Sequence, residues 1–345
     1  MEKKKFKDYL QEYIMVLVLI LVLIVFEILG KTMVGRNFFD ITNLTTLISQ
    51  KAYLVIDGVG ITFIMLGGAM DLSTGYLLST VGMVMALVDG NKSGDGTFFV
   101  LTFLAGIALA VILSGFNGVM YSWLAIFPFI ITLASQYMFQ GATYLLTGGQ
   151  SKTFSKLNPA FKAVGGTPIF SGLKTGVIIM IVMVIIGSFI LNKTHFGRNV
   201  YALGSNPDAV ALSGVSVAKM RIAVFALAGL FFGIAQIVNI GNKNGSVQQS
   251  FGVGDEFTVM AGAMLGGVKM GGGGGKISNM VVGVYLIGVL DYGMKYLNFN
   301  QYWIYVVLGI VLMAAIVLDT LQTRAAINAA KKVSGKPPKE AAAQA

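Results

Sequence analysis

The glycine-rich run GGVKMGGGGGKIS at residues 266–278 is the stretch that comes nearest to a phosphate-binding motif. Such a motif needs a glycine, four further residues and then Gly-Lys-Ser/Thr, so that backbone amides and the lysine surround a phosphate group. Here Lys276 is followed by Ile277, and Met270 stands where the first glycine is required. Two required positions fail, so we exclude ATP binding and predict a flexible turn at the cytoplasmic face. We assign to this turn the glycines Gly266, Gly267, Gly271 and Gly275.

The chain offers little else that would catalyse a reaction. It has no cysteine and a single histidine, which excludes thiolate metal sites and argues against a histidine-built metal or catalytic cluster. We find no serine–histidine–acid set and no pair of acids around a cleft motif. We therefore expect a protein that is not an enzyme and that holds neither a metal nor a cofactor.

Two acidic residues in apolar surroundings are the remaining candidates for chemistry. Asp57 lies within VIDGVGITFIML, where a charge is costly unless it faces water or the interior of a helix bundle. A place in a solute path or gate and a role as a paired structural acid both fit it. For Asp71 and Ser73, in GGAMDLSTG, we favour a cap on the next helix over a part of the path. Gln136 and Gln140 share a helix face and either line a conduit or bond a neighbouring helix, which is the commoner role. Further path or gate candidates are Asn117, Phe129 and Thr132.

The basic stretch Asn192–Arg221 is the longest polar interruption in the second half of the chain. Within it Asn206 suits a helix N-cap, Pro207 the first helical position, and Asp208 the positive end of the helix dipole. Ala209 to Ser213 can continue the helix for about two turns, and Gly214 can end it. A basic loop between membrane spans belongs on the cytoplasmic side. Either this is a docking surface for a cytoplasmic partner, to which Arg198 also contributes, or it is an ordinary loop with an incidental helix.

Composition places these elements in a membrane. Of 345 residues, 55% are apolar and only 12% are charged, and the mean hydropathy is +0.77. The net charge of +10 lies mostly in tails and loops, where it orients the chain in the lipid membrane and does not indicate nucleic-acid binding.

We predict an all-α, polytopic helical bundle of about ten spans with both termini in the cytoplasm. Residues 1–12 form a cytoplasmic tail, residues 13–321 a single transmembrane domain, and residues 322–345 a disordered cytoplasmic tail. Residues 31–51 lie outside, and FFDITNLTTLISQ within them has the pattern of a segment lying along the membrane interface.

Four segments together carry a resemblance to a known family. They are GITFIMLGGAMDLSTG, FPFIITLAS, FGRNVYALGSNPDAVALSGV and AGAMLGGVKMGGGGGKIS, of which the third is the most specific. Between about residues 44 and 321 the chain resembles the permeases of bacterial ABC importers of the ribose, xylose and galactose type, within the branched-chain-amino-acid-like superfamily. Two departures stand out: Thr258 replaces an acid that is frequent in the family, and Asp57 stands where an apolar residue is usual.

The resemblance implies the permease fold and transport of a monosaccharide across the bacterial cytoplasmic membrane. It also implies three partners: a cytoplasmic ATPase that docks around Asn206–Gly214, an external sugar-binding protein, and a second permease copy, most simply a homodimer. Because the same superfamily carries nucleosides and other small polar solutes, these stay open as alternatives. A stand-alone transporter driven by protons or sodium, with Asp57 as its ion site, is the rival from another class.

Overall fold

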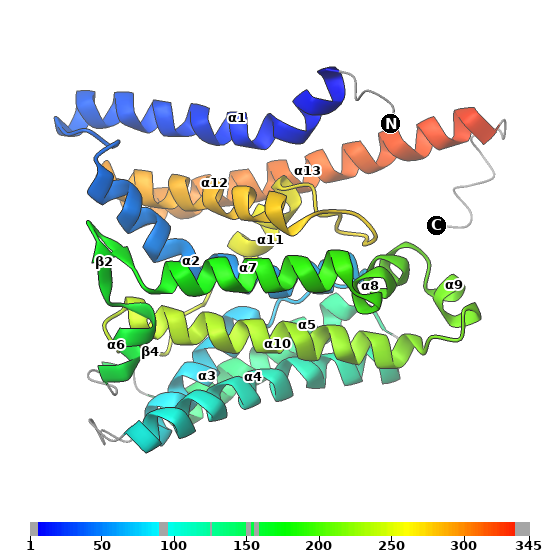
Figure 1. The fold of residues 1–345 in the computed structure, drawn as a ribbon, viewed down its shortest axis with the longest axis horizontal. Coiled ribbons are helices and arrows are strands. Elements are labelled where there is room, and N and C mark those ends of the chain that lie inside the picture. The colour runs from blue at the N-terminus through cyan, green and yellow to red at the C-terminus, as the bar shows by residue number, and fades with distance from the viewer. Residues whose placement is uncertain (1–5, 90–95, 125, 150–152, 155–158, 335–345) are drawn as a thin grey trace.

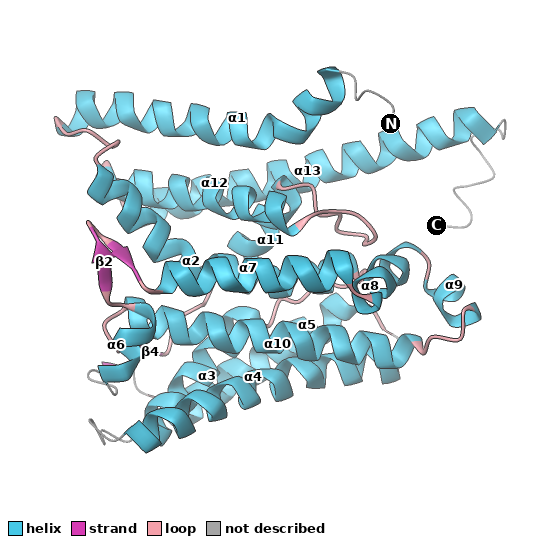
Figure 2. Ribbon diagram, viewed as in Figure 1, coloured by secondary structure: helices cyan, strands magenta, loops and turns pink. Residues whose placement is uncertain are grey.

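The computed structural model describes residues 6–89, 96–124, 126–149, 153–154 and 159–334, and these residues are almost entirely helical (Figures 1 and 2). The all-helical prediction is therefore confirmed. The long helices are α1 (Phe6–Leu29), α2 (Ile41–Leu66), α3 (Thr74–Asp89), α4 (Gly96–Leu124), α5 (Pro128–Leu146), α7 (Gly176–Lys193), α10 (Val217–Asn242), α12 (Ile277–Tyr296) and α13 (Gln301–Ser334). The short ones are η1 (Gly30–Val34), α6 (Pro159–Gly165), α8 (His195–Ser205), α9 (Pro207–Leu212) and α11 (Asp255–Leu265).

The described helices differ in their fitness to cross a membrane. Among the described residues six helices are long and apolar enough to do so. The first of the six runs from Met15 in α1 to Val34 at the end of η1. The other five are α2, α4 (from Phe98), α7, α10 and α12. Helix α3 and the first part of α13 are apolar but shorter, and α11 has only eleven residues. The expected count of about ten crossings stays a prediction.

Helix α2 is the centre of the bundle. Every residue from Leu54 to Leu66 is buried, and the helix packs against α7, α10, α11 and α12. It begins at Ile41, where the Asp40 carboxylate accepts a hydrogen bond from the Thr42 amide at 2.7 Å. The expected interfacial segment before residue 52 was therefore wrong, because it forms the first turns of α2.

The physical reason lies in a hairpin that covers these turns. Strand β2 (Pro168–Phe170) pairs antiparallel with β3 (Leu173–Lys174), and β1 (Thr153–Phe154) pairs with β4 (Val247–Gln248). The Ser49 hydroxyl donates to the Gly172 carbonyl at 3.1 Å and accepts from the Lys174 amide at 2.9 Å. In the sequence, polar residues such as Ser49 suggest a segment at the membrane interface. In the structure, the Ser49 side chain is instead hydrogen-bonded inside the fold.

The bundle has two distinct ends (Figure 1). Helices α8 and α9, the loop between α11 and α12, the start of α1 and the end of α13 lie at one end. Helix α6 and the β2–β3 hairpin lie at the opposite end. Elements far apart in sequence therefore share the end that carries the basic loop.

Helix α13 continues beyond its expected end. The tail predicted as disordered from residue 322 is helical as far as Ser334, and residues 335–345 lie outside the described part of the chain. The stretch TRAAINAAKK is rich in alanine, the strongest helix former, and basic residues suit the end of a helix. This local propensity extends the helix beyond its apolar part.

Candidate functional site

The basic loop folds into two capped helices. The Thr194 hydroxyl accepts from the Gly197 amide at 3.1 Å and begins α8, and the Asn206 side chain accepts from the Ala209 amide at 3.0 Å and begins α9. Pro207 is the first residue of α9 and Asp208 lies in its first turn. Gly214 follows the helix with a φ of +83°, which a residue with a Cβ rarely adopts. The predicted local structure from Asn206 to Gly214 is confirmed, whereas its docking role stays a prediction.

Helix α9 presents an apolar side chain to solvent. Val210 is buried and anchors the helix to the bundle, but Leu212 is 90% exposed. On the neighbouring helix α8 the Arg198 guanidinium lies 2.7 Å from the His195 ring nitrogen Nδ1, and both residues are exposed. Leu212 is thus an accessible apolar side chain on a helix whose start is fixed by the Asn206 cap.

Replacing Asn206 with alanine is expected to remove the α9 cap at a cost of about 1 kcal/mol. Because α9 has only six residues, this loss should raise the amide hydrogen exchange of residues 207–214 while leaving α10 unchanged. Hydrogen exchange followed by mass spectrometry measures the difference. Asn206→Asp keeps a side-chain acceptor and serves as the matched control; equal exchange in both variants would show that the cap does not hold α9.

The end of α8 meets two other segments in a close contact made largely of backbone, which we call the glycine junction (Leu66–Gly68, Gly204–Ser205 and Gly271–Gly275). The Gly273 amide donates to the Leu66 carbonyl at 3.0 Å. A Cβ on Gly204 would overlap that carbonyl, and a Cβ on Gly272 would lie 2.7 Å from the Gly204 Cα atom. Three segments separated by more than sixty residues each can approach this closely only because they carry glycine.

The glycine-rich turn is therefore a packed element, which corrects the prediction of a flexible turn. The Tyr201 hydroxyl of α8 donates to the Gly275 carbonyl at 2.8 Å and holds the end of the turn. A Cβ on Gly275 would lie 2.7 Å from the Val268 Cα atom, and one on Gly266 would overlap Asn279 of α12. By contrast, a Cβ on Gly267 or Gly271 would meet nothing within 4 Å. The sequence did not predict that Gly204, Gly272 and Gly273 take part in a close contact. The unusual density of glycine at residues 271–275 is the one sequence feature that indicates it.

Beside the junction, the break between α2 and α3 contains a buried polar chain. The Asp71 carboxylate accepts from the Ser73 amide at 2.8 Å and from its hydroxyl at 2.6 Å, and the Asn117 amide donates to the Ser73 oxygen at 2.8 Å. The Thr132 hydroxyl of α5 donates to the Met70 carbonyl at 3.3 Å. The structure thus brings together four of the predicted path candidates. Asp71 orders the turn just before α3 through its bonds to Ser73, and its predicted role as a cap of α3 stays a prediction.

Asp57 lies apart from that chain. It is fully buried in α2, and neither carboxylate oxygen has a hydrogen-bond partner among the described residues. The alternative of a paired structural acid is therefore wrong within the described part of the chain. A buried polar group without a partner is costly, so the position invites a functional explanation.

The remaining path candidates lie on α5. Phe129 is 46% exposed at the start of the helix, and Gln136 and Gln140 are half-buried farther along it. No hydrogen bond in the described structure joins either glutamine to the Asp71 chain. The contacts within this one chain therefore do not test whether Gln136 and Gln140 line a path, and that role stays a prediction.

Comparison with known proteins agrees with this architecture. The family described as "Branched-chain amino acid transport system / permease component" matches residues 43–316. The ribose import permease protein RbsC of Escherichia coli strain K12 is 32% identical over 286 residues, which are 82% of this chain and 87% of that protein. RbsC of Bacillus subtilis is 31% identical over 84% of this chain and 88% of its own length.

A relative of a second sugar type is the galactose/methyl galactoside import permease protein MglC of Haemophilus influenzae, 26% identical over 83% of this chain and 88% of that protein. No solved structure matches the chain. The family match covers most of the chain, and the apolar helices described above make it a multi-pass membrane protein. The chain therefore belongs to the branched-chain amino acid transport system permease family, and it is a transport component and not an enzyme.

Proposed function

We propose that the chain is the membrane subunit of an ATP-driven importer of a monosaccharide of the ribose, galactose or xylose class. It acts in a bacterial cytoplasmic membrane with three partners: a cytoplasmic ATPase, an external sugar-binding protein and a second permease copy. The observation that carries the proposal is the capped helix α9, which exposes Leu212, in a chain whose relatives are named ribose and galactose import permeases.

The glycine junction supplies a route from docking to transport. The ATPase binds α9, which packs against α8, and the end of α8 touches both the α2–α3 break and the glycine-rich turn. Because Gly204 approaches Leu66 and Gly272 backbone to backbone, a displacement of α8 at this point cannot be absorbed by a change of side-chain rotamer. ATP-driven closure of the docked ATPase therefore moves the break that contains Asp71 and opens the path to one side of the membrane.

The arrangement of the bundle supports an orientation. The start of α1 and the end of α13 lie at the same end as α8 and α9 (Figure 1). That end carries the basic loop and the helix that docks the ATPase, so it faces the cytoplasm. Both termini are then cytoplasmic, and the β2–β3 hairpin and α6 face the external binding protein.

Helix α5 supports a place for the second copy. Its apolar residues Tyr137, Met138 and Leu145 are more than half exposed in the single chain. In the membrane, lipid or another permease covers this face. A homodimer with α5 at its interface places the half-buried Gln136 and Gln140 beside a path shared by the two copies, which agrees with their predicted role.

One observation favours the rival mechanism of ion-coupled transport, namely that the Asp57 carboxyl has no hydrogen-bond partner in the part of the chain that the structure describes. We expect Asp57→Asn, which removes the charge and keeps the shape, to leave sugar uptake within about threefold of the unmodified chain because no partner is lost. Uptake at matched amounts of membrane protein measures this. Abolished uptake in Asp57→Asn, with preserved uptake in Asp57→Glu, would favour the ion-coupled mechanism.

The direct test measures the energy source. Radiolabelled D-ribose, D-galactose and D-xylose are offered to cells with and without this chain. Ionophores collapse the proton and sodium gradients while fermentation maintains ATP. We expect uptake that requires the chain and survives the ionophores. Uptake that is lost with the gradients at constant ATP would contradict the proposed importer; uptake of a nucleoside alone would keep the mechanism and replace the substrate.

A further inference from the structure

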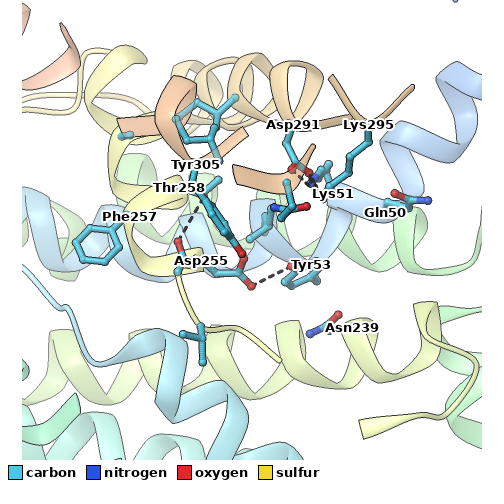
Figure 3. A pocket seen from close by; sticks show the side chains of 18 of the residues that line it. Gln50, Lys51, Tyr53, Asn239, Asp255, Phe257, Thr258, Asp291, Lys295 and Tyr305 are labelled. Atoms are coloured by element: carbon cyan, nitrogen blue, oxygen red, sulfur yellow. Dashed lines mark hydrogen bonds and ion pairs between the residues drawn. The ribbon is translucent and has the colours of Figure 1, made fainter. Parts of the chain in front are cut away.

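A cavity of about 570 Å³ opens at the end of the bundle away from α8 and α9. It lies among the first half of α2, the end of α10, the start of α11, the end of α12 and the start of α13 (Figure 3). Binding pockets for small molecules typically measure about 300–1,000 Å³. The cavity is therefore large enough for a solute the size of a single sugar ring.

Two asparagines of α10 line this cavity, and each carries a buried side-chain oxygen without a partner among the described residues. Asn239 is only 2% exposed; its amide nitrogen donates to the Gln236 side chain at 3.2 Å, and its oxygen Oδ1 has no partner among the described residues. The Asn242 nitrogen donates to the Ser49 carbonyl at 2.7 Å, and its Oδ1 is likewise buried and unpartnered. Each hydrogen bond fixes the side-chain nitrogen of an asparagine and leaves the oxygen Oδ1 of the same amide group without a donor. Because a buried acceptor without a donor is costly, these two oxygens point to a ligand that supplies hydroxyl or amide donors.

The charged residues of the cavity satisfy one another in part. Asp291 forms ion pairs with Lys51 and with Lys295, the latter at 2.8 Å, and the Tyr53 hydroxyl donates to Asp255 at 2.9 Å (Figure 3). Two further lysines, Lys174 and Lys243, also line the cavity. Four lysines against two aspartates leave the lining net positive, which disfavours a cationic solute.

Aromatic rings complete the lining. Tyr305 is 63% exposed and Phe257 is 43% exposed, and both lie at the cavity with Tyr53 (Figure 3). Ring faces that stay accessible offer apolar surface next to the polar groups of α10. The combination of flat apolar faces with fixed amide acceptors suits a compact molecule that has both C–H faces and hydroxyl groups.

We propose that this cavity is a binding site of the permease itself for an uncharged, hydroxyl-rich solute, whose hydroxyls donate to the side-chain oxygens of Asn239 and Asn242. This rests on the proposed function, because it names the place where the imported solute first binds the membrane subunit. The external binding protein then releases its sugar into a site with matching hydrogen-bond acceptors and not into an inert channel. A cationic analogue is rejected there by the lysines.

The test uses the full-length chain in lipid nanodiscs without its partners. Saturation-transfer difference NMR, which detects weak binding, is applied with D-ribose, D-galactose and the cation D-glucosamine as probes. We expect at least one neutral sugar to bind and D-glucosamine not to bind. Asn239→Leu and, separately, Asn242→Leu are each expected to weaken sugar binding by about tenfold, because each removes one acceptor.

Asn43→Leu is the matched control, since Asn43 lies on α2 outside the cavity and donates to the Asn37 carbonyl at 3.2 Å. It should bind sugar like the unmodified chain. Asn239→Asp keeps an acceptor and adds a negative charge, so it should gain binding of D-glucosamine, a result that misfolding cannot produce. Absence of sugar binding to the unmodified chain, or equal binding by all variants, would overturn the proposal. If the chain binds no sugar although cells import one through it, the cavity proposal fails and the proposed importer function stands. If the cavity binds sugar but cells take up none through the chain, the cavity proposal stands and the proposed importer function fails.

Discussion

Replacing Gly204 with alanine is expected to abolish sugar uptake while the ATPase still associates with the permease. A Cβ at this position would overlap the Leu66 carbonyl, which is backbone at the end of α2 and has no rotamer to change. Such overpacking costs about 1–3 kcal/mol and displaces α8 from the α2–α3 break. We therefore expect uptake to fall at least about tenfold at equal amounts of protein in the membrane.

The chain provides a matched control for this change. A Cβ on Gly271 would meet nothing within 4 Å, and its φ is not positive, so Gly271→Ala makes the same chemical change beside the junction without a clash. It should transport normally. Co-purification of the ATPase with both variants separates a loss of coupling from a loss of docking, since α9 is unaltered in each. If Gly204→Ala transports as well as Gly271→Ala, the glycine junction does not transmit the movement.

Replacing Leu212 with lysine is expected to prevent docking of the ATPase and hence uptake. Leu212 is 90% exposed at the last position of α9, so it contributes almost nothing to the fold of the single chain. A lysine at a helix C-terminus also suits the helix dipole, so α9 itself should stay folded. In a docking surface, however, the substitution places a charge where an apolar anchor is buried, at a cost of about 2 kcal/mol or more, which weakens association at least about thirtyfold.

Pull-down from gently solubilised membranes measures this association. Leu212→Met keeps an apolar side chain of similar volume and should retain the ATPase. Replacement of Asn206–Gly214 by a Gly/Ser linker should lose it altogether. Undiminished co-purification with Leu212→Lys and with the linker variant would show that α9 is an incidental helix in an ordinary loop, the alternative that the sequence leaves open.

The properties that could be predicted from the sequence depend on residues close to one another in the chain. The bounds of α9 follow from a cap, a proline and a glycine within nine residues, because each acts on its own backbone or on that of a residue three positions away. The apolar segments follow from composition alone, since a membrane tolerates only helices whose backbone groups are satisfied internally. The failed spacing around Lys276 excludes a phosphate loop without reference to any neighbour.

Tertiary structure decided the properties that depend on residues distant in the chain. The sequence gives no sign that Leu66, Gly204 and Gly273 share one contact, or that Ser49 is paired with a hairpin more than a hundred residues later. Nor does it reveal that Asp57 and Asn239 have side-chain oxygens without partners among the described residues, since pairing depends on which groups the packed helices bring within about 3 Å. The periodic pattern of apolar residues in a segment indicates that it forms a helix with a buried face. Close backbone contacts and cavities depend instead on the relative positions of whole helices, which no local pattern encodes.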